Sequence, residues 1–360
     1  AEQPPVFKIA DGPVVGATLA AGGASTQIGA PTTTVARYVT ALDGHVLEVP
    51  LDVPGAAPRT ISNTTIPGIE RAFFTEGGRG VIVQYLEGST IKTAHLALSA
   101  ALATTSVSGP SIRFLPDGVA AIAVSRDGAS VAYALPRNTG GAQAGLTLYT
   151  ARADGSSPVA VGSTPLPHIQ LSWPSKGALL FYTNSATGID GIVFSIDLTK
   201  GGTSALLSGQ GITATADPSF SFLLHLISDG TRSSLFAEDL KSGATSLVPG
   251  AADSLGAPLP ETCVWGGTAA ANAVAYCAAP SAAAAPNYLD MWHSGEASSE
   301  SALVSIDLRR GAVAIATPGS RDGGEPSDMI SLALSPDSRY LSFIAKDDET
   351  LWGVRLGTSQ

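Results

Sequence analysis

The chain has 360 residues, of which 44% are hydrophobic and only 14% are charged, and its formal net charge is -10. This acidic balance argues against binding to nucleic acid or to an anionic lipid surface, because both require clustered Lys and Arg. No apolar run reaches the roughly 18 residues of a membrane-spanning helix, so we expect no membrane span. The 40 glycines and 24 prolines indicate many turns, as is typical of a chain built from short strands.

Apolar strand segments recur along the chain, and each runs into a polar turn. Their ends lie roughly 42 to 68 residues apart, near Leu51, Leu98, Asp154, Leu198, Leu240, Leu308 and Leu356. A period of this size without helical segments predicts an all-β fold, a seven-bladed β-propeller of four-stranded antiparallel blades. We expect a single domain, 1–360, with blades at approximately 10–62, 68–108, 111–162, 168–208, 211–249, 260–318 and 328–357, the last joined by 5–10.

The ring is expected to close with strands from both ends of the chain. After Leu356 only residues 357–360 follow, which is too short for an outer strand of the last blade. The N-terminal run Val6–Ile9 precedes the first inner strand and can take that place. Such a closure leaves no unpaired edge between the two ends.

A recurrent turn supports this fold. Ser335-Pro336-Asp337-Ser338 precedes an apolar strand, and Ser125-Arg126-Asp127-Gly128 does the same. Related turns occupy 173–177 and 217–219. Pro presets φ for such a turn, and Asp or Ser caps it. These motifs resemble the TolB-like, or WD40-like, propeller repeat of bacterial proteins, over roughly five of the seven blades. The resemblance implies the propeller fold and an extracytoplasmic setting, but the family has no single activity to transfer.

The two cysteines lie in short strand-like runs that a glycine-containing segment separates. If the runs pair as a hairpin, Cys263 and Cys277 stand opposite each other, at a Cα spacing of about 4.5 to 5.5 Å that a disulfide can bridge. The alternative is two buried thiols. A disulfide indicates an oxidising compartment. The acidic composition and one sequon at Asn63 are likewise compatible with an exported protein. With the bacterial origin that the resemblance implies, we expect a protein that is periplasmic, displayed at the cell surface or secreted.

The candidate binding residues lie in the connections of blades six and seven. The widest interval of the repeat contains an insertion between the second and third strands of blade six, 278–301, and the next long connection is 318–328. Both are expected on the face of the ring that usually binds ligands. The candidates are Tyr288, Asp290, Trp292, His293 and Glu296 in the insertion, and Arg321, Asp322 and Glu325 in the connection.

Two pairs of interpretations remain open for this sector. Residues 290–350 hold eleven carboxylates against five Lys and Arg, which suits a cation such as Ca²⁺ or a cationic partner. The same acidity also suits a solvated rim that keeps the protein soluble. Tyr288 and Trp292 suit a recognition patch of exposed aromatics, or an insertion that packs back over the channel mouth. Asp290, His293 and Glu296 could also be read as a transition-metal site, but the single histidine argues against it.

No catalytic motif stands out. The chain has no Gly-x-Ser-x-Gly elbow and no His-Glu-x-x-His pair, and His45, His95, His168 and His225 lie in or beside strands, which favours structural roles. We therefore expect a non-enzymatic exported propeller without a cofactor, a protein-binding or assembly module at the cell envelope or cell surface. The alternative is a hydrolase or lyase at the mouth of the central channel, which requires carboxylates, His or Arg to converge there.

Overall fold

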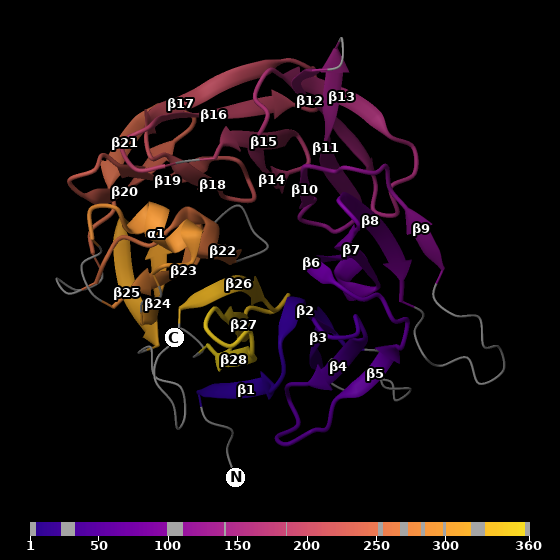
Figure 1. The fold of residues 1–360 in the computed structure, drawn as a ribbon. Coiled ribbons are helices and arrows are strands. Elements are labelled where there is room, and N and C mark those ends of the chain that lie inside the picture. The colour runs from indigo at the N-terminus through magenta and orange to yellow at the C-terminus, as the bar shows by residue number, and fades with distance from the viewer. Residues whose placement is uncertain are drawn as a thin grey trace.

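Seven four-stranded antiparallel sheets stand around a central axis in the computed structural model (Figure 1). The structure describes residues 5–22, 33–98, 111–139, 142–184, 186–250, 255–266, 273–281, 285–297, 300–317 and 328–356. In each blade the strand nearest the axis is followed outward by its neighbours in the order of the sheet. The predicted seven-bladed β-propeller is confirmed.

Strands β2 to β13 form the first three blades. Their bounds are β2 Val14–Ala21, β3 Thr34–Thr40, β4 Val46–Pro50, β5 Arg59–Ser62, β6 Ile69–Thr75, β7 Gly80–Glu87, β8 Thr90–Ala97, β9 Ile112–Phe114, β10 Ala121–Val124, β11 Ser130–Thr139, β12 Ala142–Arg152 and β13 Val159–Thr164. The short 3-10 helix η1, Glu76–Gly78, follows β6. Strand β9 pairs with β8, so it belongs to the second blade, whereas the sequence placed the start of the third blade at 111.

Strands β14 to β28 and β1 form the other four blades. Their bounds are β14 Ile169–Ser175, β15 Ala178–Thr183, β16 Asp190–Asp197, β17 Thr203–Gln210, β18 Thr213–Ala216, β19 Phe222–Ser228, β20 Ser233–Asp239, β21 Ala244–Leu247, β22 Cys263–Gly266, β23 Val274–Pro280, β24 Ser301–Asp307, β25 Ala312–Thr317, β26 Met329–Leu334, β27 Tyr340–Ala345, β28 Leu351–Arg355 and β1 Val6–Ala10. The 3-10 helix η2, Pro260–Thr262, precedes β22, and one α-helix, α1, spans Tyr288–Ser294.

The ring closes as predicted. Strand β1 pairs antiparallel with β28 and is the outer strand of the seventh blade. Phe7 lies opposite Gly353, where an added Cβ would come within 2.5 Å of the Phe7 ring, so a glycine is required at this position. The hydroxyl of Tyr340 donates a hydrogen bond of 3.0 Å to Asp52 Oδ1, which joins the seventh blade to the first.

The recurrent turn works through one hydroxyl and one carboxylate. Ser125 Oγ donates to Asp127 Oδ1 (2.8 Å) and accepts from the backbone N–H of Ser130 (3.0 Å), so it bridges the two strands. Ser335 makes the same pair of bonds, to Asp337 and from the N–H of Tyr340. Each bridge satisfies a backbone donor at the point where the ladder ends, which explains the Ser-x-Asp pattern.

Buried apolar side chains fill the spaces between neighbouring blades. The central strands contribute most of them, and the largest fully buried ones include Tyr133, Phe343, Ile82, Leu179 and Leu223. Each such side chain contributes about 1.5 to 3 kcal/mol relative to an exposed one. The blades therefore hold one another in place, and loops at both faces are carried by a rigid ring.

Cys263 and Cys277 form a disulfide, as predicted. They are directly opposite each other in β22 and β23, with 4.1 Å between their Cα atoms, and Cys277 is fully buried. The alternative of two buried thiols is wrong. No helix in the described part of the chain is long and apolar enough to cross a membrane.

Candidate functional site

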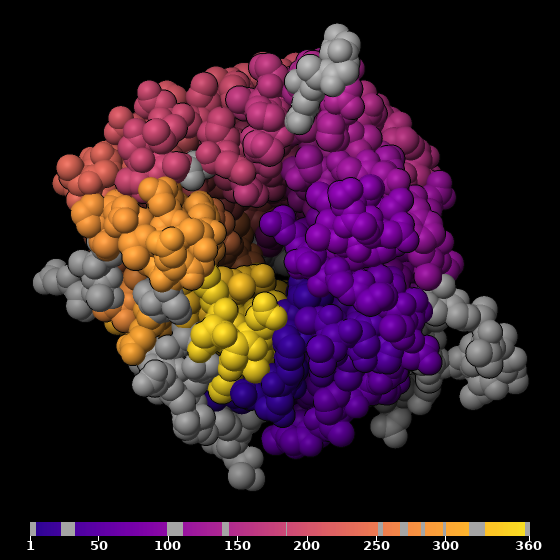
Figure 2. Space-filling view, in the orientation of Figure 1, coloured from indigo at the N-terminus to yellow at the C-terminus, as the bar shows by residue number. Residues whose placement is uncertain are grey.

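The insertion of the sixth blade contains the helix α1, which the sequence did not predict. It ends at Gly295, which has a φ of +79° and whose N–H bonds to the carbonyl of Trp292. The helix lies on the near face of the ring in Figure 1, beside the channel. Figure 2 shows the same face with a hollow at its centre, and the orange surface around α1 forms part of the rim.

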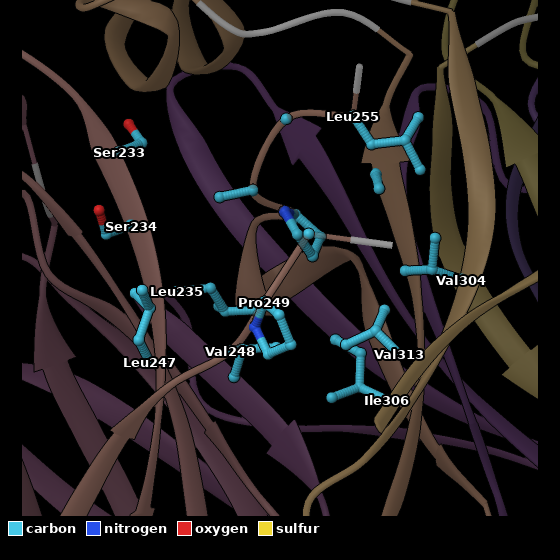
Figure 3. Close-up of a pocket in the computed structure, with 15 residues that line it drawn as sticks. Ser233, Ser234, Leu235, Leu247, Val248, Pro249, Leu255, Val304, Ile306 and Val313 are labelled. Carbon is cyan, nitrogen blue, oxygen red and sulfur yellow. The ribbon is translucent and has the colours of Figure 1, made fainter. Parts of the chain in front are cut away.

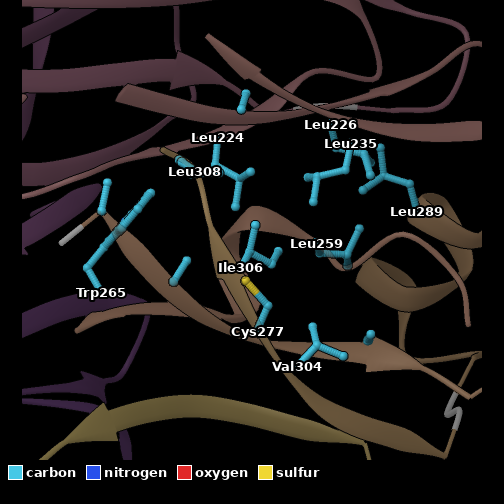
Figure 4. Close-up of a cluster of buried hydrophobic side chains, with 14 of the residues drawn as sticks. Leu224, Leu226, Leu235, Leu259, Trp265, Cys277, Leu289, Val304, Ile306 and Leu308 are labelled. Carbon is cyan, nitrogen blue, oxygen red and sulfur yellow. The ribbon is translucent and has the colours of Figure 1, made fainter. Parts of the chain in front are cut away.

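The inner side of α1 is part of the core. Leu289 is fully buried and Tyr288 is 6% exposed, and both belong to a cluster that includes Leu226, Leu235 and Cys277 (Figure 4). Leu226 and Leu235 come from blade five, and Cys277 comes from blade six. The insertion therefore packs back onto the ring between these two blades, and Tyr288 is not an exposed anchor for a partner.

Polar contacts tie α1 to the fourth and seventh blades. Asp290 Oδ1 accepts a bond of 2.8 Å from the N–H of Thr187, in the connection between β15 and β16. Trp292 Nε1 donates to Asp328 Oδ2 (2.9 Å), just before β26. Lys346 Nζ donates to the carbonyl of Trp292 (2.8 Å) and lies 4.1 Å from the centre of its ring. A cation at the C-terminal end of a helix also interacts favourably with the helix dipole and so stabilises the helix.

His293 links α1 to η2. Its Nε2 lies 2.5 Å from Glu261 Oε1, and this hydrogen bond raises the pKa of His293 above its usual value. The imidazole is therefore more readily charged than a free histidine, and the two groups form an ion pair when it is protonated. The side chains are 35% and 22% exposed, so solvent screens the attraction.

The candidates of the insertion that the structure describes do not contact a common partner. Asp290 and His293 contact separate parts of the ring, and Glu296 is exposed. Arg321, Asp322 and Glu325 lie outside the described residues. Among the residues that the structure describes, no three His, Cys, Asp or Glu side chains are grouped so that they could hold a metal ion.

Several carboxylates of the acidic sector cap turns. Asp307 Oδ1 accepts from the N–H groups of Arg309 and Arg310, each at 3.1 Å. Asp348 Oδ1 accepts from both the N–H and the hydroxyl of Thr350. Asp328 is 2% exposed and also accepts from Ser301 Oγ (2.7 Å). These oxygens are thus engaged with donors of the chain itself.

The central channel contains a cavity of about 420 Å³ at the end away from α1. It is lined by the turns that follow the inner strands, with Trp265, Phe74 and Leu334 on its apolar side. Of the described residues that line it, two are ionisable, Arg126 and Asp127. The alternative of a hydrolase or lyase requires a cluster of such groups at the mouth of the channel.

Two more hollows lie between blades. An apolar groove of about 200 Å³ separates blades five and six, with Leu235, Leu247, Val304 and Val313 around it (Figure 3). A polar hollow separates blades two and three and contains His95, for which the sequence favoured a structural role. No local motif marks either one, because each is assembled from strands and turns far apart in the chain.

Comparison with known proteins shows the fold. No family model and no curated protein matches the sequence. Among solved structures, TolB from Acinetobacter baumannii matches with a TM-score of 0.43 and 12% identity over 89% of this chain, which spans 63% of that one. An oligogalacturonate lyase in complex with manganese has a TM-score of 0.53 and 10% identity, over 97% of this chain and 99% of that one.

A prolyl endopeptidase has a TM-score of 0.55 and 16% identity, over 92% of this chain and 45% of that one. At these identities the matches show the fold alone. The seven-bladed ring with its recurrent turns is the β-propeller fold that the sequence predicted. Because the same fold carries a lyase and a peptidase, it does not by itself choose an activity.

Proposed function

We propose that this chain is a non-catalytic binding module of an exported bacterial protein, and that it binds a protein partner at the cell envelope or cell surface. The binding surface is the face that carries α1. One observation carries the proposal: α1 is fixed by side-chain contacts to Thr187, Glu261 and Asp328, which lie in or beside blades four, six and seven. A surface held rigid before binding loses little conformational entropy when the partner docks.

The outer end of α1 is the part offered to a partner. His293, Ser294, Gly295 and Glu296 are exposed, while Leu289 is buried beneath them. Lys346 Nζ donates hydrogen bonds to the carbonyls of Trp292 and Ala297, which flank this end of the helix. The ring therefore fixes the position of this end. With Glu296 exposed on a chain of net charge -10, the complementary surface is basic.

Two further observations support the proposal. Among the described residues that line the channel cavity, Arg126 and Asp127 are the ionisable ones, and such a sparse set favours binding over catalysis in the channel. The disulfide between Cys263 and Cys277 favours an oxidising compartment, because cytosolic thiols are kept reduced. Both support an exported binding module.

Site-specific crosslinking tests the proposal in the whole protein. A photoreactive amino acid replaces Glu296 in one variant and Ser242 in a control variant, and both are irradiated in intact cells of the producing bacterium. Ser242 is also exposed but lies in the turn between β20 and β21, on the opposite face. We expect one defined protein adduct from position 296 and none from position 242.

Identical adducts from both positions, or no adduct from position 296, would contradict the proposal. The variant Glu296→Lys supplies a second readout, because it reverses the charge of an exposed residue that has no hydrogen bond in the described structure. It is expected to weaken capture of the same protein while leaving the fold intact, which circular dichroism checks.

A further inference from the structure

A polar hollow of about 670 Å³ opens between blades two and three, on the face opposite α1. Its walls are the turns and strand ends of the two blades, and five of the described residues that line it are ionisable. They are Glu76, His95, Arg113, Arg152 and Asp154. The volume lies within the range of about 300 to 1,000 Å³ that is typical of sites for small molecules.

His95 is the buried polar group of this hollow. Its side chain is only 4% exposed, and Nε2 lies 3.2 Å from Thr75 Oγ1. Nδ1 makes no hydrogen bond to any residue that the structure describes, although the ring borders the hollow. Gly80 makes room for the pair, since a Cβ there would come within 2.5 Å of both Nε2 and Oγ1. Burial lowers the pKa of His95, so the ring is neutral at pH 7.

Glu76 is held in an unusual backbone conformation at the edge of the hollow. Its φ is +52°, and its N–H donates a bond of 2.9 Å to the carbonyl of Gly128, in the recurrent turn of blade three. A Cβ on Gly128 would approach the Glu76 nitrogen to 2.5 Å. The turn therefore fixes the Glu76 backbone, while the carboxylate has no hydrogen bond or ion pair with a described residue.

The remaining charges are one pair and one cation without a partner. Asp154 lies 3.6 Å from Arg113 Nη1 and caps its own turn through Ser156, so these two charges compensate each other. Arg152 is fixed through its backbone, whose N–H donates to the carbonyl of Ser156 (2.9 Å). Its guanidinium makes no hydrogen bond or ion pair within the described part of the chain.

We infer that this hollow binds a small zwitterion of the amino-acid type, with its carboxylate on Arg152, its ammonium on Glu76, and a hydrogen bond to Nδ1 of His95. The reason is the presence of two opposite charges without partners in one cavity. A simple anion would be repelled by Glu76, and a simple cation by Arg152, whereas a zwitterion compensates both. This site is independent of α1 and of the partner surface proposed above.

Isothermal titration calorimetry on the whole chain tests the inference. The probes are glycine, L-serine, L-glutamate and L-lysine, with acetate and methylamine as single-charge controls. We expect saturable heat from at least one amino acid and none from acetate or methylamine at the same concentration. Arg152→Met and Glu76→Gln are each expected to weaken that binding by about tenfold or more, because each removes one charged contact.

Arg310→Met is the matched control, because Arg310 is an exposed arginine of the sixth blade. It should leave the affinity unchanged. Arg152→Lys keeps the charge and should restore part of the binding that Arg152→Met loses, and circular dichroism verifies that each variant is folded. The inference is overturned if no amino acid gives saturable heat up to about 10 mM. It is equally overturned if acetate binds as well as the amino acids, or if binding is indifferent to both Arg152→Met and Glu76→Gln.

Discussion

On the face that carries α1, the polar side chains of Asp290, Trp292 and His293 each contact another part of the ring. On the opposite face, between blades two and three, the carboxylate of Glu76 and the guanidinium of Arg152 have no hydrogen bond or ion pair among the described residues. The first region is rich in chemically versatile residues whose polar atoms hold a helix in place. The second also contains ionisable residues, but among those that the structure describes only Arg113 and Asp154 form an ion pair, and the side-chain charges of Glu76 and Arg152 remain available to a ligand.

The two regions differ in whether their polar side chains already have partners in the chain. A side chain whose polar atoms are bonded to the chain is less available to a ligand than one without such a partner. Buried or closely packed polar groups need hydrogen-bond partners. The polar side chains of the long insertion therefore bond to the ring and anchor the helix. We propose that the anchored insertion presents its outer surface to a protein partner. A hollow lined by uncompensated charges suits a small charged molecule instead. We therefore expect the two faces to respond separately to substitution.

Removal of the disulfide is expected to have the largest effect. The bridge closes a short loop, with a sequence separation of 14 between Cys263 and Cys277. In the double variant Cys263→Ala/Cys277→Ala the free energy of unfolding should fall by about 3 kcal/mol, because the unfolded chain regains the freedom that the bridge removes. Urea unfolding with and without a reductant measures this.

The double variant also supplies its own control, because it has no bridge for the reductant to cleave. A reductant should destabilise the wild type and leave the variant unaffected. Amino-acid binding to the hollow of blades two and three should persist in the variant under native conditions. A loss of that binding without loss of the fold would show that the two faces are coupled.

Gly128→Ala is expected to have the next largest effect. It should lower the free energy of unfolding by about 1 to 3 kcal/mol, because the substitution strains the backbone. Gly128 has a φ of +69°, and an added Cβ would meet the nitrogen of Glu76. Gly243→Ala is the matched control, since Gly243 has nearly the same φ but open space around the added Cβ. Thermal unfolding should show a greater loss for Gly128→Ala, and calorimetry should show weaker amino-acid binding in this variant alone. Equal losses in the two variants would argue against contact with Glu76 as the cause.

Lys346→Met is expected to lower the free energy of local unfolding of α1 by about 1 to 2 kcal/mol. The substitution removes hydrogen bonds to the carbonyls of Trp292 and Ala297 and the contact with the indole ring. Hydrogen exchange measured by mass spectrometry should become faster across 288–294. Lys241→Met, at an exposed turn, is the control and should leave the exchange of α1 unchanged. If both variants exchange alike, Lys346 does not hold the helix.

The fold was more predictable from sequence than the sites were. Turns such as Ser335-Pro336-Asp337 are local, and together with the spacing of the strand ends they predict seven blades, while the pairing of Cys263 with Cys277 follows from one hairpin. The boundary after the second blade was placed between 108 and 111, whereas β9, at Ile112–Phe114, still pairs with β8, and no local pattern reveals this pairing. Contacts such as Trp292 with Asp328, or Glu76 with Gly128, join residues far apart in the chain, and no local pattern reveals them.

The smallest expected effect concerns pH and the pair of His293 and Glu261. The hydrogen bond to Glu261 raises the pKa of His293 in the folded protein, so protonation favours the folded, anchored helix. The contribution is fully present below the unfolded pKa of about 6.5 and is lost as the pH rises through the higher folded pKa. Because both side chains are partly exposed, we expect less than about 1 kcal/mol. Hydrogen exchange of 288–294, corrected for its intrinsic pH dependence, should accelerate over this window in the wild type and show no such step in Glu261→Gln. A step of equal size in Glu261→Gln would assign the pH response to another group. The corrected hydrogen exchange of the segments around the hollow between blades two and three should not change in either protein over the same window.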